Sequence, residues 1–563
     1  MARAVRSAME TGQHLMVQAG TGTGKSLAYL VPAVLHSDRV VVATATLALQ
    51  HQLVERDIPA LLDAAADLLG ARPSYAVLKG RSNYACLHRV RDGAPDDQGA
   101  LVALPTGSMG AEVLALRKWA ESESKAGGVG DRDSAPPHTD RPWQQVSVSH
   151  RECLGAAKCP YGVECFAERA RDRAMASRLI VTNHSLLAID AVEGVPMIPE
   201  YDVVVVDEAH ELAARVTQAA TDELSVSMIE RAARRAGNFL DEGEAEELGD
   251  SADALRAALD DTEAGRVDRL PEGLGAALAM VRSAARAAFS AFPKESSDSD
   301  VNAARQQARG MVDEVRKISE RLVEHDEADV TWVADRDRSR GGSQLFVAPL
   351  QVWGPLRDKL LSDKTVIFTS ATLKLGGDFT ALATSIGLKP TERADHSIDT
   401  PGDVSAVAAV EVEDAGGSGA AASGDDEAPR VLAWRGIDVG SPFDYQRQAM
   451  LYIARHLPVP GRDGIGMSQL AEIQGLVQAA DGRTLGLFSS RRAAETAADA
   501  AREALPHLPI LCQGDGQLSH LQAEFLANPA VSLFGTLSLW QGLDIPGPTC
   551  QLVIIDRIPF PRP

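Results

Sequence analysis

The sequence of 563 residues lacks the features of several protein classes. No apolar run approaches the roughly 20 residues that a membrane-spanning helix needs. The first residues, MARAVRSAMETGQ, lack the apolar segment of a secretory signal peptide. Cysteine occurs only six times, and in a long intracellular chain so few cysteines do not make a disulfide framework. We therefore expect a cytoplasmic protein without a membrane segment.

Positive charge is also scarce. The formal net charge is −22, whereas proteins that bind nucleic acid usually carry a basic surface. The acidic residues are concentrated, however, because 241–263 hold ten Asp or Glu and one Arg, and 411–429 hold six acids and no Lys or Arg. A locally basic channel is therefore compatible with the acidic total.

Short β-branched runs alternate with helical segments along the chain. Apolar runs such as VVVV are typical of strands buried on both faces of a parallel sheet, and helices between them make βαβ units. The sequence therefore predicts an α/β fold with doubly wound parallel sheets. The expected strands are His14–Gln18, Val40–Thr46, Leu179–Asn183, Val203–Val206, Thr365–Ser370, Thr484–Ser489, Ile510–Cys512, Val531–Thr536 and Leu552–Asp556.

Two long insertions divide the first α/β domain in this prediction. A cysteine-containing insertion is expected at 76–178, and its stretch 122–142, SESKAGGVGDRDSAPPHTDRP, is expected to be a mobile loop. A helical insertion is expected at 211–345. The first domain then consists of 1–75, 179–210 and 346–390, and the second domain of 391–563 with a disordered loop at about 411–429.

Residues 19–26 read AGTGTGKS and stand between an expected strand and an expected helix. Glycines let successive backbone N–H groups curl around phosphate oxygens, while Lys reaches the β- and γ-phosphates and a hydroxyl binds Mg²⁺. Lys25 and Ser26 fill the last two roles, and the helix N-terminus adds its dipole. The alternative, a flexible Gly/Thr turn, is disfavoured by this context. The predicted ATP site is Ala19, Gly20, Thr21, Gly22, Thr23, Gly24, Lys25 and Ser26.

A second motif, DEAH at 207–210, follows the run YDVVVV. It places two carboxylates at the carboxyl end of a buried strand, where open α/β sheets bind their ligands. Asp207 is predicted to hold Mg²⁺, and Glu208 to orient and deprotonate the attacking water. Taken alone, the motif is also compatible with an acidic helix start. Paired with the phosphate loop, it predicts ATP hydrolysis.

Four cysteines, Cys86, Cys153, Cys159 and Cys165, are separated by 66, 5 and 5 residues. Structural zinc sites usually contain closely paired cysteines, and no such pair occurs here. Glycine and proline between the last three cysteines favour loops that wrap one centre, and a 4Fe–4S cluster held by four thiolates fits that arrangement. Isolated buried cysteines and a zinc site remain alternatives. Cys512 and Cys550 are expected to lie in the core.

Together, these motifs resemble the DinG-type (XPD-like) iron–sulfur helicases of superfamily 2. The resemblance rests on AGTGTGKS, DEAH, TSATL (369–373), GRSNYAC (80–86) and CLGAAKCPYGVEC (153–165), and it runs in order across nearly the whole chain. It implies two RecA-like domains, the first of which carries a 4Fe–4S insertion and a helical arch. It also implies movement from 5′ to 3′ on single-stranded DNA.

The resemblance further implies individual roles. Ser370-Ala371-Thr372, next to His210, would couple the ATP state to DNA binding. The family also has an adenine-recognition element before residue 1 and an arginine-finger motif after Pro563, so we expect a chain truncated at both ends. The residues implied to lie on the DNA path are Thr44, Thr46, Asn183, His184 and Gly542.

The resulting hypothesis is a monomeric ATP-dependent DNA helicase that acts on single-stranded or forked DNA in repair or replication. ATP is expected between the two α/β domains, and the cysteine insertion is expected to separate the strands. Two alternatives remain open. One is an ATPase that moves on nucleic acid, including RNA, without unwinding it, and the other is a truncated fragment that binds ATP or DNA with little turnover.

Overall fold

The computed structural model describes residues 1–36, 38–92, 108–150, 152–193, 197–294, 299–334, 342–394, 431–459, 464–516, 518–536, 539, 545 and 547–557. The chain forms two compact units. The first contains Met1–Ala45 and Leu53–Pro442, and the second contains Thr46–Gln52 and Phe443–Pro563.

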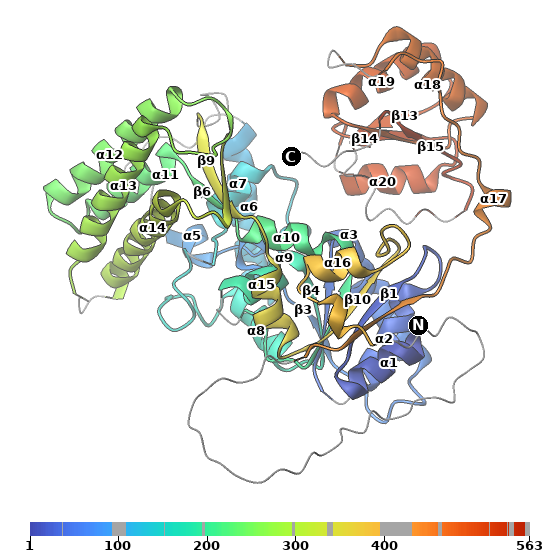
Figure 1. Ribbon diagram of the computed structural model, residues 1–563, viewed down its shortest axis with the longest axis horizontal. Helices are drawn as coiled ribbons and strands as arrows, with labels where there is room; N and C mark the ends of the chain where they lie inside the picture. The colour runs from blue at the N-terminus through green and yellow to red at the C-terminus, as the bar shows by residue number, and fades with distance from the viewer. Residues whose placement is uncertain are drawn as a thin grey trace. The chain divides into compact units, whose positions relative to one another are not determined.

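A seven-stranded sheet is the centre of the first unit (Figure 1). Its strand order is β11-β1-β10-β5-β2-β4-β3, and every pair of neighbours is parallel. The five strands expected in this part of the chain are all present. The strands are β1 (His14–Gln18), β2 (Val40–Thr44), β3 (Tyr75–Val77), β4 (Leu179–Asn183), β5 (Val203–Asp207), β10 (Thr365–Ser370) and β11 (Trp434–Asp438).

Helices cover both faces of this sheet, because successive strand residues point to opposite sides. Val40 and Val42 of β2 pack in a core with α1, α2 and α4, whereas Val41 and Ala43 pack in a core with α9 and α10. The result is the three-layer α/β fold that the sequence predicts. These helices are α1 (Ala2–Thr11), α2 (Lys25–Leu35), α4 (Ile58–Ala64), α9 (His184–Glu193) and α10 (Leu212–Ala219).

The first insertion has a core of its own, which includes Trp143 and Phe166. The loop expected at 122–142 is shorter than predicted, because α6 includes the first five residues of that stretch and α7 begins at Asp140. Buried Lys79 also binds Asp131 and Asp133 within it. The helices of this insertion are α5 (Leu87–Asp92), α6 (Ser108–Ala126), α7 (Asp140–Val146) and α8 (Phe166–Met175).

The second insertion contains the expected helices and, in addition, a small antiparallel sheet of order β6-β9-β8-β7 (Figure 1). Trp332 and Phe346 stack across two of its strands, with ring centroids 5.2 Å apart. The sequence analysis missed this sheet. Its elements are α11 (Val226–Ala236), α12 (Glu242–Asp260), α13 (Glu272–Ala291), α14 (Ser299–Glu324), β6 (Asp222–Leu224), β7 (Gly265–Arg266), β8 (Asp329–Ala334) and β9 (Gln344–Pro349).

The second unit has a four-stranded parallel sheet of order β13-β14-β12-β15. All four strands expected there are present. They are β12 (Thr484–Phe488), β13 (Ile510–Cys512), β14 (Ser532–Thr536) and β15 (Leu552–Ile555), and the longer helices are α18 (Met467–Ala479), α19 (Arg491–Ala504) and α20 (Leu518–Ala527). Shorter helices of the chain are α3 (Leu47–Gln52), α15 (Trp353–Leu356), α16 (Thr380–Ser385) and α17 (Tyr445–Gln448).

The expected domain boundary at 391 does not match the sheets. Strand β11 lies in the first sheet beside β1, and its fully buried Trp434 donates a hydrogen bond from Nε1 to the Lys389 carbonyl at 2.8 Å. The first unit therefore extends to Pro442. The loop expected at 411–429 lies outside the described residues. Within the described part of the chain, no helix is both long and apolar enough to cross a membrane.

Candidate nucleotide and cysteine sites

The glycine-rich loop joins β1 to α2, as the sequence predicts. Gly22 and Gly24 have φ values of 76° and 74°, in the left-handed region that glycine adopts without a steric penalty. Gly24 caps α2, so Lys25 is the first residue of the helix and the N-terminal backbone N–H groups lie beside the loop. Gly20 is also required, because a Cβ there would lie 2.9 Å from the Ser441 Cβ.

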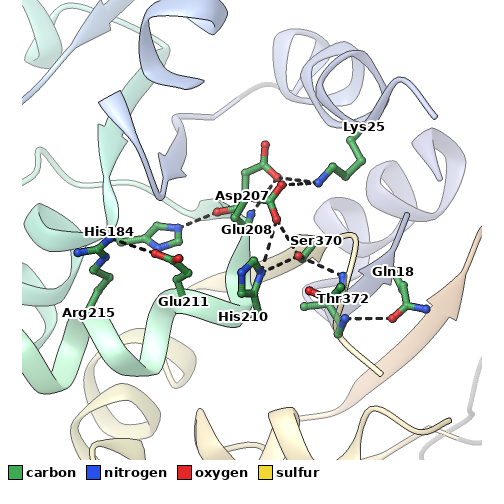
Figure 2. A network of polar contacts seen from close by, with 11 residues as sticks. Gln18, Lys25, His184, Asp207, Glu208, His210, Glu211, Arg215, Ser370 and Thr372 are labelled. Carbon is green, nitrogen blue, oxygen red and sulfur yellow. Dashed lines mark hydrogen bonds and ion pairs between the residues drawn. The ribbon is translucent and has the colours of Figure 1, made fainter. Parts of the chain in front are cut away.

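Lys25 and the two predicted carboxylates converge at one edge of the first sheet (Figure 2). The Lys25 Nζ lies 2.7 Å from Glu208 Oε1 and 3.8 Å from Asp207 Oδ1. The phosphate loop follows β1, and the two carboxylates stand at the end of β5. Both strands are parallel neighbours of β10, so their carboxyl ends lie at the same edge of the sheet. The convergence that an ATP site requires is therefore present.

Asp207 is the last residue of β5, and its side chain is almost fully buried. Its Oδ1 accepts a hydrogen bond from the Glu208 backbone N–H, and its Oδ2 accepts one from the Tyr29 hydroxyl, each at 2.9 Å. Burial raises the pKa of Asp207, and the nearby charge of Lys25 offsets this only in part. A divalent cation at this carboxylate would favour its charged form, so Asp207 fits the role of a Mg²⁺ ligand.

Glu208 lies between Lys25 and Ser370, bonding Lys25 through Oε1 and Ser370 through Oε2 (Figure 2). Its φ of 53° is left-handed, a conformation that costs a non-glycine residue about 1–3 kcal/mol and is frequent at functional sites. Burial raises the pKa of Glu208, but Lys25 and Ser370 outweigh burial and the pKa lies below its usual value. The carboxylate is therefore ionised, as a general base must be.

Ser370 and His210 complete this network. The Ser370 hydroxyl donates to Glu208 Oε2 at 2.7 Å, and the His210 Nδ1 lies 2.8 Å from the same hydroxyl oxygen. The Thr372 backbone N–H also donates to that oxygen at 3.3 Å. The last residue of β10 is therefore bonded directly to the predicted catalytic carboxylate, and the segment after β10 is bonded to it through Ser370.

The four predicted cysteines line a single cavity in the first insertion. None of them is in a disulfide. Cys165 is the N-cap residue of α8, and Cys86 immediately precedes α5. Burial raises the pKa of Cys86 to about 11, and burial also raises the pKa of Cys165. Both thiols are therefore protonated without a metal, and a bound metal would displace the protons.

The Arg81 guanidinium lies against this cavity. Its Nη1 donates to the Cys153 Sγ at 3.5 Å, and its Nη2 forms an ion pair with Glu168 at 2.5 Å. A fixed positive charge next to thiolates stabilises an anionic cluster. In the described part of the chain, no three His, Cys, Asp or Glu side chains are placed to hold a single metal ion.

Comparison with known proteins decides the family. The DEAD/DEAH box helicase family model matches residues 2–69, and the helicase C-terminal domain model matches residues 473–563. The ATP-dependent helicase DinG of Mycobacterium tuberculosis is 44% identical over 584 residues, which cover 100% of this chain and 81% of the relative. The chain belongs to the DinG family of ATP-dependent helicases.

Other relatives agree with this assignment. An Escherichia coli protein described as ATP-dependent DNA helicase YoaA is 29% identical over 606 residues, which cover 100% of this chain and 82% of the relative. A solved structure described as an XPD helicase aligns with a TM-score of 0.51 at 14% identity, over 100% of this chain and 84% of that one. At that identity the structural likeness supports the fold alone, which is two RecA-like parallel-sheet domains.

Two of the residues expected on the DNA path of this DinG-family chain, Thr44 and His184, are buried. Thr44 is fully buried, and its hydroxyl donates to the Thr182 carbonyl at 3.3 Å. His184 is 1% exposed and donates from Nε2 to the Asp207 carbonyl at 2.8 Å. Burial lowers the pKa of His184 to about 4, so the ring is neutral and offers no charge to a phosphate. Neither side chain reaches the surface, which is incompatible with a direct DNA contact.

Two other residues expected to contact DNA, Asn183 and Thr46, immediately precede the helices α9 and α3. The Asn183 Oδ1 accepts a hydrogen bond from the Leu186 N–H at 2.8 Å, and the Thr46 Oγ1 accepts one from the Leu49 N–H at 3.3 Å. Both residues are half-buried, so they remain candidates for DNA contact. Gly542 lies outside the described residues. The sequence analysis also missed Tyr29, although its position three residues after Ser26 puts both on one side of α2.

Proposed function

We propose that this DinG-family chain is a monomeric ATP-dependent DNA helicase that moves from 5′ to 3′ on single-stranded DNA in repair or replication. The observation that carries the proposal is the convergence of Lys25, Asp207 and Glu208 at one sheet edge, 2.7–3.8 Å apart. The relative from Escherichia coli is described as a DNA helicase, which supports DNA as the substrate.

In this proposal the nucleotide site works through fixed charges. The backbone of residues 19–26 cradles the phosphates and Lys25 neutralises them, while Ser26 and Asp207 hold Mg²⁺. Glu208 takes a proton from the attacking water. Because Ser370, the last residue of β10, bonds Glu208 and also accepts from the Thr372 backbone N–H, movement of the segment that follows β10 would change the position of the base.

A forked duplex tests the helicase activity and its direction. We expect this chain to separate the strands in an ATP-dependent reaction when the fork carries a 5′ single-stranded tail, and to fail when only a 3′ tail is present. ATP hydrolysis stimulated by single-stranded DNA without strand separation would favour a translocating ATPase instead. Equal stimulation by RNA would contradict DNA as the specific substrate.

We further propose that Cys86, Cys153, Cys159 and Cys165 bind a 4Fe–4S cluster. The shared cavity and the Arg81 contact support this assignment. When bound, the cluster would supply a structural cross-link between segments distant in sequence.

The cluster proposal predicts iron and visible absorbance in protein purified without oxygen. Cys153→Ser should lose both, because serine is a poor iron ligand and one corner of the cluster would be unbound. The matched control is Cys512→Ser, whose buried thiol lies in β13 of the second unit and should leave iron content unchanged. A colourless wild-type protein that contains zinc would contradict the proposal.

A further inference from the structure

Tyr29 contacts Asp207, one of the two side chains expected to hold Mg²⁺. It is fully buried on α2, three residues after Ser26, which is the other. The Tyr29 hydroxyl donates to Asp207 Oδ2 at 2.9 Å. One phenol of α2 therefore holds the carboxylate at the end of β5.

The direction of this hydrogen bond follows from its chemistry. An ionised carboxylate only accepts, so the Tyr29 hydroxyl donates to Asp207 Oδ2. The other lone pairs of the carboxylate oxygens stay available for a cation.

Tyr29 also limits the rotation of the Asp207 side chain. The Glu208 backbone N–H holds Oδ1 and Tyr29 holds Oδ2, each at 2.9 Å, so the carboxylate plane is held from both sides. Residues that orient metal ligands in this way change metal affinity or activity by about 10–100-fold when they are removed.

We propose that Tyr29 is a positioning residue that sets the affinity of the nucleotide site for its divalent cation by orienting Asp207. This inference rests on the proposed ATP site. The competing explanation is that Tyr29 only fills the core beneath α2, where it packs with Leu30 and Val42. A purely structural residue would change stability but not the affinity for the cation.

Tyr29→Phe removes one oxygen and keeps the ring. The probe is Mn²⁺, added to protein saturated with a non-hydrolysable ATP analogue, with free Mn²⁺ measured by electron paramagnetic resonance. We expect Tyr29→Phe to bind Mn²⁺ about 10–100-fold more weakly than wild type. Binding of the same analogue in excess EDTA should be unchanged, because Tyr29 has no role without the cation.

The matched control is Tyr201→Phe. Tyr201 is also buried, in the core on the other face of the sheet, so the same oxygen is removed away from the site. Its Mn²⁺ affinity should equal that of wild type. If Tyr29→Phe does not fold, Tyr29→Met provides a second variant that lacks the hydroxyl and retains an apolar side chain.

The outcomes separate the two proposals. Unchanged Mn²⁺ affinity in a folded Tyr29→Phe protein overturns the role of Tyr29 and leaves the ATP site intact. Failure of wild-type protein to bind Mn²⁺ with the analogue overturns the ATP site itself. Equal weakening in Tyr29→Phe and Tyr201→Phe would show a general structural effect and would also overturn the inference.

Discussion

Glu208→Gln is expected to lower the turnover number for ATP by about 10²–10⁴-fold, the usual contribution of a general base. The amide keeps the size of the side chain and can still bond Ser370, but it cannot accept a proton from water. Binding of MgATP should change little, because the phosphate loop and Asp207 are unaltered. A turnover measurement with saturating single-stranded DNA, combined with a separate nucleotide-binding titration, tests both parts.

Glu211→Gln is the matched control for this variant. Glu211 lies three residues further along the chain and forms an ion pair with Arg215 at 3.1 Å instead of with Lys25. Its turnover number should stay within a few-fold of wild type. If Glu208→Gln retains wild-type turnover, or if both variants lose it equally, Glu208 is not the base.

Lys79→Ala is expected to destabilise the first insertion by about 3–5 kcal/mol, the cost of removing one partner from a buried ion pair. Lys79 is 5% exposed, and its Nζ lies 2.8 Å from Asp131 and 2.6 Å from Asp133. Burial lowers the pKa of Lys79, but hydrogen bonds to the two carboxylates outweigh burial and leave the pKa raised, so the ammonium is charged. Its removal would leave two partly buried carboxylates close together without a counter-charge.

Hydrogen exchange resolves this effect, because it reports the opening free energy of the insertion separately from the rest of the chain. Amides in α7 and α8 should lose protection, while amides in the first sheet should not. Arg266→Ala is the control, since Arg266 and Asp268 are both largely exposed and such pairs contribute only about 0.2–1 kcal/mol. Unchanged protection in Lys79→Ala would contradict the assigned role of this ion pair.

The parts predicted correctly from the sequence were those with a strong local signal. The run VVVV is apolar on both faces and bounded by polar residues, so its burial within a parallel sheet followed directly. The phosphate loop and DEAH motif each combine a strand end with specific side chains. Their convergence followed from the rule that parallel strands present their carboxyl ends at one edge.

The parts that were missed depend on contacts between distant segments. Strand β11 pairs with β1 across about 420 residues, and this pairing has no local signature. The small sheet of the second insertion uses strands of two to six residues that contain polar side chains, so helical periodicity dominated the prediction. Thr44 was assigned to DNA by resemblance, and only the packing of β2 against β4 shows that its hydroxyl is turned inward.

The most direct test of the central claim is ATP hydrolysis by the Lys25→Ala variant in the presence of single-stranded DNA. If Lys25, Asp207 and Glu208 form one site, loss of the ammonium removes the positive charge that both carboxylates face and that the phosphates require. Hydrolysis should then fall to the background rate while the protein remains folded. Hydrolysis within a few-fold of wild type would mean that the convergence at this sheet edge is not the ATPase site.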